Sequence, residues 1–128
     1  MPNGPARAEF WKEFMTSRCN YPAPDRLQAQ LATAEFSDFC ECGCNSFAVK
    51  PSRGAPPLAL PGRDIGAIYT ADFNLPDSRT LEIILLVDET GNLAHIEIDC
   101  CANSYPVPDV VEVEGEPFRT WAAEELLQ

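Results

Sequence analysis

Two alternating apolar segments joined by a short turn constrain the fold of this chain more than any other feature. Residues 80–88 read TLEIILLVD, residues 93–101 read LAHIEIDCC, and the intervening ETGN offers Gly91 for a positive φ. Successive side chains of a strand point to opposite faces of a sheet. The pattern therefore predicts a β-hairpin at the centre of an antiparallel sheet.

The alternation also predicts which side chains face the core. We expect these to be Leu81, Ile83, Leu85, Val87, Ala94, Ile96, Ile98 and Cys100. The opposite face would then carry Glu82, Ile84, Leu86, Asp88, His95, Glu97, Asp99 and Cys101. Because the first strand is apolar on both faces at its middle, we expect it to be a central strand.

Helical periodicity precedes the strands. Within residues 6–18, an apolar stripe predicts a helix that packs through Phe10, Trp11, Phe14 and Met15. A second helix is expected from Asp25 as N-cap, with Gln28 in a capping-box position, to near Phe36. Two helices followed by a run of strands predict one α+β domain over residues 1–128, in which N-terminal helices pack on a mostly antiparallel sheet.

The remaining segments complete this outline. We expect a loose lead at 1–5, a short strand at 47–50 and a Pro/Gly-rich surface loop at 51–63. A strand within 64–75 would turn these side chains inward: Ile65, Ala67, Tyr69, Ala71 and Phe73. Near the C-terminus we expect an edge strand at 110–118 and a helix at 119–128, with Trp121 and Leu126 inward.

The charge is strongly negative and unevenly distributed. The net charge is −11, and residues 80–128 hold eleven acidic side chains against Arg119 alone. Nucleic acid and anionic membranes attract basic surfaces, so neither is expected as a partner. An acidic half instead favours rapid capture of a basic partner, although solubility alone also accounts for it.

No apolar run approaches the ~18 residues of a membrane span, and the first residues lack the apolar core of a signal peptide. We therefore expect a cytoplasmic protein whose six cysteines are reduced.

Three of those cysteines lie in the segment FCECGCNSF. In an extended strand, Cys40, Cys42 and Cys44 would share one face about 6.6 Å apart, too far for one tetrahedral ion. We therefore expect no metal or other cofactor. A turn at Gly43 keeps open the alternative of a zinc site formed by Cys40, Cys42, Cys44 and Cys100, or with Cys101 or His95 as the fourth ligand.

Catalytic chemistry is not indicated. His95 is the only histidine, and no glycine-rich nucleophile turn or oxyanion donor accompanies the cysteines. We therefore expect a binding protein rather than an enzyme.

The sheet face away from the core is the expected binding surface. Acidic side chains would surround the apolar Ile84 and Leu86, as in a protein interface with anchors inside a charged rim. The expected partner-binding residues are Asp72, Glu82, Asp88, His95, Glu97, Asp99 and Tyr105. The alternative is that a helix covers this face, which would make its apolar centre ordinary core.

The segments CECGCNSF, LEIILLVDETGNLAHIEIDC and YPVPD together resemble small acidic bacterial immunity proteins that are partners of polymorphic toxins. The matching positions are Cys42, Gly43, Cys44, Ser46, Asp88, Gly91, Leu93, Ile96, Glu97 and Ile98. The likeness covers roughly residues 40–109 and excludes the N-terminal helices, and the Cys100–Cys101 pair departs from it. It implies inhibition of a cognate toxin by direct binding, with no chemistry of its own. The acidic charge favours a toxin with a basic cleft, which acidic side chains would occlude.

Overall fold

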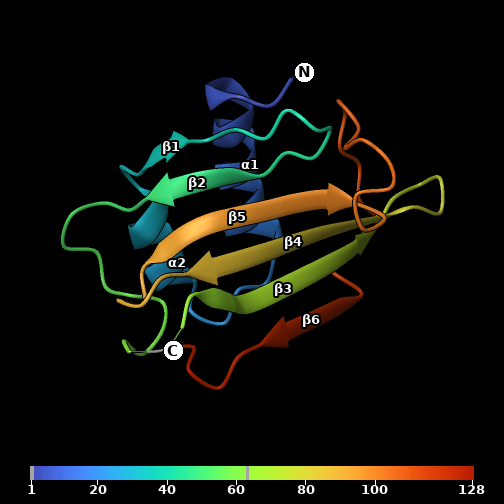
Figure 1. Ribbon diagram of the computed structural model, residues 1–128. Helices are drawn as coiled ribbons and strands as arrows, with labels where there is room; N and C mark the ends of the chain where they lie inside the picture. Colours follow the sequence, from blue (N-terminus) through green and yellow to red (C-terminus); the bar gives the residue numbers. More distant parts are fainter. Residues whose placement is uncertain (1, 63) are drawn as a thin grey trace.

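Six antiparallel strands form one sheet in the order β1-β2-β5-β4-β3-β6, with both helices behind it (Figure 1). The computed structural model describes residues 2–62 and 64–128. The helices are α1 (Pro5–Arg18) and α2 (Pro24–Leu31). The strands are β1 (Glu35–Ser37), β2 (Phe47–Lys50), β3 (Gly66–Asn74), β4 (Thr80–Val87), β5 (Leu93–Cys100) and β6 (Arg119–Ala122). The predicted α+β class with N-terminal helices is confirmed.

The core lies between the helices and the inner face of the sheet, the side that the helices cover (Figure 1). All four inward side chains of β4 are at most 1% exposed: Leu81, Ile83, Leu85 and Val87. From α1, Trp11 and Met15 are fully enclosed, and the Phe14 ring meets Phe73 edge-on at a centroid distance of 5.3 Å. Phe10, predicted to lie in the same stripe, remains exposed.

Two bulges change the predicted faces. A register shift between Ala67 and Tyr69 buries Ile68, whereas Ile65, expected inward, is 68% exposed before β3 begins. A second shift in the β4–β5 pairing places Leu93, not Ala94, in the core. Alternation holds only while pairing is regular, because one extra residue on one strand reverses the faces beyond it.

The second helix is shorter than predicted. Its N-cap is Ala23, without a side-chain hydrogen bond, and Asp25 lies inside the first turn. The helix stops at Leu31 because residues 35–37 instead pair with β2 as an edge strand. Phe36 thereby packs on Phe47 at a ring distance of 5.2 Å, a contact that a longer helix would not make.

The C-terminal prediction was wrong. Residues 110–118 form no strand, and residues 119–122 form strand β6 rather than a helix. Strand β6 satisfies the hydrogen-bonding groups at the open edge of β3, from Tyr69 to Asp72. Trp121 consequently lies 49% exposed, while Leu126 is buried as expected.

The segments expected to be loose or exposed are anchored in part. In the Pro/Gly-rich loop, Leu58 and Ala59 are buried, and both of their N–H groups donate to the Gly91 carbonyl in the β4–β5 turn. At the N-terminus, the Asn3 amide donates to two backbone carbonyls of the segment 40–46. Neither helix of the described chain has the length and apolarity needed to cross a membrane.

Candidate functional site

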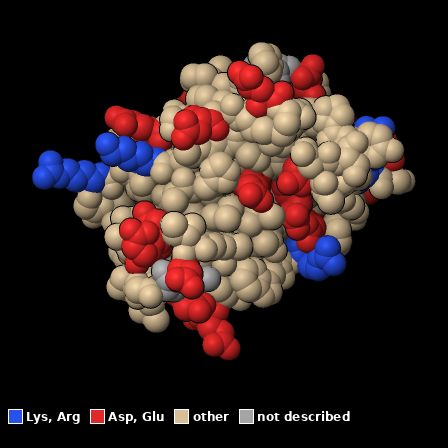
Figure 2. Space-filling model, viewed as in Figure 1, with Lys and Arg blue, Asp and Glu red and all other residues tan. Residues whose placement is uncertain are grey.

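The outer face of the sheet, the side away from the helices, carries charged side chains in cross-strand register. Asp72 of β3 pairs with Glu82 of β4, which pairs with Asp99 of β5. These three carboxyl groups, called the acidic row here, cross the three longest strands side by side. Figure 2 views this face and shows acidic side chains gathered right of its centre, with a basic group beside them. Within the described chain, neither helix lies over this face (Figure 1).

One end of the acidic row is neutralised. Arg119 of β6 pairs with Asp72, and its Nε donates to Asp72 Oδ2 at 2.8 Å. The Asp72 side chain is only 7% exposed, whereas that of Arg119 is 70% exposed. Asp72 was predicted to contact a partner directly, but the structure places it beneath Arg119 as the buried half of an ion pair.

The other two carboxyl groups of the row are poorly compensated. Burial, followed by hydrogen bonding with Asp72 and the charge of Asp72, raises the pKa of Glu82. Burial, followed by the charge of Glu97, raises the pKa of Asp99. The buried Oδ1 atom of Asp99 accepts no hydrogen bond from any described residue. Like charges directly opposite each other on a sheet repel, so an external cation would stabilise the ionised forms of Glu82 and Asp99.

Apolar side chains lie beside the acidic row. In the next row along the strands, Trp121 pairs with Thr70, Thr70 with Ile84, and Ile84 with Glu97. Leu86 and His95 follow as a further pair, both half-buried. Ile84 and Glu97 are half-buried too, so the expected apolar centre with acidic neighbours is present. Trp121 was missed because it was assigned to the inner face of a helix.

Two predicted binding residues lie apart from the row. Asp88 follows β4 at the end opposite Glu82, about 20 Å of strand away. Its Oδ1 accepts hydrogen bonds from the N–H groups of Thr90 and Asn92, which makes it a structural residue of the hairpin turn. Tyr105 lies in the loop after β5, exposed on one side and covered by the Arg79 guanidinium 3.9 Å from its ring centroid.

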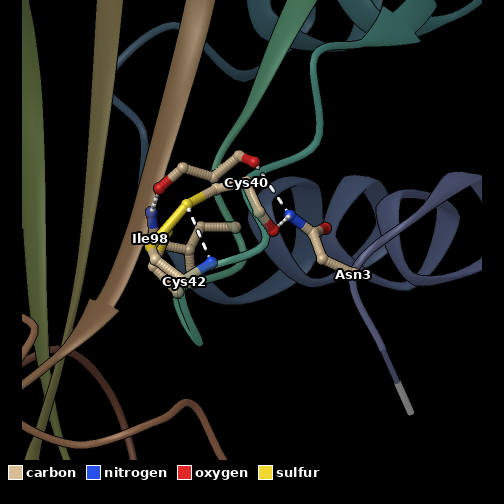
Figure 3. The surroundings of a disulfide bond; sticks show 6 residues. Asn3, Cys40, Cys42 and Ile98 are labelled. Carbon is tan, nitrogen blue, oxygen red and sulfur yellow. Dashed lines mark hydrogen bonds between the residues drawn. A yellow bond between two sulfur atoms is a disulfide. The ribbon is translucent and has the colours of Figure 1, made fainter.

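The cysteine segment is not an extended strand, so the spacing argument against a shared ion was wrong. A bend at Gly43, where φ is +101°, brings the three sulfur atoms of Cys40, Cys42 and Cys44 within 4.8 Å of one another. Cys40 and Cys42 form a disulfide, contrary to the expected reduced state, and Cys44 Sγ lies 3.1 Å from Cys42 Sγ. Figure 3 shows the disulfide beside Ile98 of β5.

Hydrogen bonds with four other parts of the chain hold this cysteine loop, residues 40–46, in place. The Asn45 N–H donates to the Ile98 carbonyl at 2.9 Å, and the Val107 N–H donates to the Gly43 carbonyl at 3.0 Å. The Asn3 amide donates to the carbonyls of Cys40 and Ser46 (Figure 3). The side-chain oxygen Oδ1 of Asn45 accepts hydrogen bonds from Arg7 and Trp11 of α1, so the loop is also joined to the core.

The predicted fourth metal ligands lie elsewhere. Cys100 is fully buried on the inner face, and burial raises the pKa of its thiol to about 11. Cys101 lies beyond β5, where its sulfur accepts a hydrogen bond from the Thr80 N–H, and His95 belongs to the outer face. Among the described residues, only Cys40, Cys42 and Cys44 form a cluster that could share an ion, which corrects the four-ligand alternative.

Comparisons with models of protein families, with curated proteins and with solved structures find no match for this chain.

Proposed function

We propose that this protein is an immunity protein that binds a basic toxin domain through the outer face of its sheet. The observation that carries the proposal is the acidic row, in which Asp72, Glu82 and Asp99 lie in register and, among the described residues, Arg119 pairs with Asp72. The resemblance of residues 40–109 to immunity proteins supports a toxin as the binding partner.

The electrostatics favour an external cation. Folding brings Glu82 and Asp99 into a setting that raises both pKa values, mainly by removing water. A lysine or arginine from a partner would replace the lost hydration and stabilise the ionised carboxylates. The partner would also be attracted over a distance by the eleven acidic residues after position 79, which speeds encounter at low salt.

Apolar anchors complete the surface. Trp121 is half exposed on the strand next to Thr70, and Ile84 and Leu86 lie at the middle of the same face. Binding energy in protein interfaces is concentrated in a few such residues, tryptophan prominent among them, whereas charged neighbours set the association rate. We infer that the acidic row steers the toxin and that Trp121 provides the anchor.

The test is survival of cells that express this protein together with a toxin, if its neighbouring gene encodes a secreted protein with a C-terminal toxin domain. In the double variant Glu97→Lys and Asp99→Lys, protection should be lost, because like-charge contact with a basic cleft costs several kcal/mol. The matched control is Glu9→Lys with Glu13→Lys, which makes the same charge change on the exposed surface of α1 and should still protect.

Both variants should retain the circular dichroism spectrum of the parent protein. The purified protein and the toxin domain should associate more slowly as the salt concentration rises, because charges farther apart than about 8–10 Å are screened at physiological ionic strength. A folded outer-face variant that protects as well as the control would move the interface away from this face and overturn the proposal.

A further inference from the structure

The cysteine loop is a second cluster of reactive side chains, separate in sequence from the residues of the acidic row. The sulfur atoms of Cys40, Cys42 and Cys44 lie within 4.8 Å of one another at the Gly43 bend, and the loop is hydrogen-bonded to Ile98 of β5. We propose that, once the Cys40–Cys42 disulfide is reduced, these three thiolates bind one thiophilic d10 metal ion, Cu(I) or Zn(II).

The sulfur positions suit such an ion. A zinc–thiolate bond measures about 2.3 Å, so two thiolates on one ion lie roughly 3.8–4.0 Å apart in tetrahedral or trigonal geometry. All three sulfur atoms already lie within 4.8 Å of one another, and Cys42 Sγ and Cys44 Sγ are 3.1 Å apart. Small adjustments of side-chain torsions would therefore bring them to coordination distance, and soft thiolates select these ions over hard ones.

The backbone of the loop is positioned before any ion arrives. Hydrogen bonds from Asn3, Asn45 and Val107 fix its carbonyl and N–H groups to the N-terminus, β5 and the loop after β5. A metal site gains affinity when its ligands lose little conformational freedom on binding. The three cysteines also differ in exposure, since Cys42 is exposed and Cys44 is buried, so an ion can enter from the side of Cys42.

With Zn(II), which prefers four ligands, three protein ligands leave one coordination position for a small molecule or water. The loop borders a hollow lined by Pro2, Asn3, Glu41, Pro106, Val107 and Asp109, together with Cys40 and Cys44. Structural zinc sites normally use four protein ligands, whereas sites with three keep a position open for exchange. The arrangement therefore fits a reactive or exchangeable ion better than a purely structural one.

The disulfide makes metal binding dependent on redox state. In the present structure Cys40 and Cys42 are bonded to each other, which leaves Cys44 as the one thiol of the loop. A dithiol reductant transfers two electrons and two protons: the S–S bond breaks, both cysteines become thiols, and the reductant becomes its own disulfide. Metal entry then displaces the thiol protons to form three metal–thiolate bonds.

The experiment is metal titration of the purified full-length protein without oxygen. The protein is treated with a phosphine reductant, which becomes the phosphine oxide with oxygen from water, and is then titrated separately with Zn(II) and Cu(I). Native mass spectrometry gives the stoichiometry, and thiolate-to-metal charge-transfer absorption reports the bonds. We expect one equivalent of at least one of the two ions on reduced protein and none on unreduced protein.

Two variants show where the ion binds. Cys42→Ser removes one ligand at an exposed position and should weaken binding at least 100-fold, whereas Cys101→Ser, outside the cluster, should bind as the parent does. Circular dichroism of both variants before titration shows that they are folded. Reduced parent protein that binds neither ion, or a folded Cys42→Ser variant that binds as tightly as the parent, would overturn the proposal. Neither result affects the proposal that the outer face binds a toxin, because that proposal is tested by cell survival.

Discussion

Strand β4 presents two contrasting faces from one continuous run of eight residues. Its inner residues, from Leu81 to Val87 at every second position, are at most 1% exposed, whereas the outer residues between them are only half-buried and include Glu82. The inner face is apolar without exception and the outer face mixes acidic and apolar side chains. Folding requires the inner side chains to be apolar, but it does not require charged side chains on the outer face. The outer charges are therefore available for another role.

The largest expected effect comes from placing the same charge on the two faces. Leu85→Asp should unfold the protein, because an unpaired carboxylate in the core costs several kcal/mol against a total stability of about 5–15 kcal/mol. Leu86→Asp, one residue along and on the outer face, should leave it folded. Urea unfolding followed by circular dichroism measures both. Equal stability of the two variants would contradict the assignment of faces.

A smaller effect is expected at the edge of the inner face. Gly91 has φ of +84°, and a Cβ atom there would overlap the Ala59 carbonyl, which lies in the segment anchored by the Gly91 carbonyl itself. Gly91→Ala should lower the free energy of unfolding by about 2–4 kcal/mol. Gly54 has a similar φ of +79° but open space around it, so Gly54→Ala should cost only about 1 kcal/mol.

Thermal unfolding of the two glycine variants separates steric overlap from backbone strain. If Gly91→Ala lost no more stability than Gly54→Ala, the contact between the β4–β5 turn and residues 58–59 would be unimportant for the core.

The smallest effect concerns the acidic row. Because the pKa of Glu82 is raised in the folded protein, the folded state holds its proton to higher pH than the unfolded state does. Stability should therefore fall as the pH rises from the ordinary glutamate pKa of about 4.3 through the raised value. Glu82→Gln should remove this fall and raise the free energy of unfolding at pH 7 by up to about 1 kcal/mol, allowing for solvent screening.

Urea unfolding at pH 4 and pH 7 checks the sign. The control is Glu9→Gln on the exposed surface of α1, which should change stability by no more than about 0.5 kcal/mol at either pH. A loss of stability at pH 7 in Glu82→Gln would show that the carboxylate is stabilising and that the acidic row does not require a cation.

The face assignments that could be read from the sequence are those within regular strands. Leu81, Ile83, Leu85 and Val87 are buried as predicted, because side-chain alternation is a local property of extended backbone. Ile65 was assigned to the core but lies before β3 begins, and Ala94 was assigned to the wrong face because bulges arise from pairing between strands, which no local pattern records.

Parts of both candidate sites depended on contacts between distant segments. Trp121 and Arg119 reach the outer face only because residues 119–122 join β3, although their own composition favours a helix. The proximity of the three sulfur atoms likewise depends on the bend at Gly43 and on hydrogen bonds between the loop and residues 3, 98 and 107.

The sequence by itself determined the class of the fold, the central β4–β5 hairpin and the presence of an acidic face with an apolar middle. Periodicity depends only on residues close together in the sequence, and net charge is a sum over the whole chain. Neither quantity depends on the tertiary arrangement. Only the tertiary structure decided that Asp72 is held by Arg119, that Trp121 joins the outer face and that three sulfur atoms meet. Each of these depends on backbone groups far apart in the chain finding hydrogen-bond partners, a constraint that acts between segments and not within them.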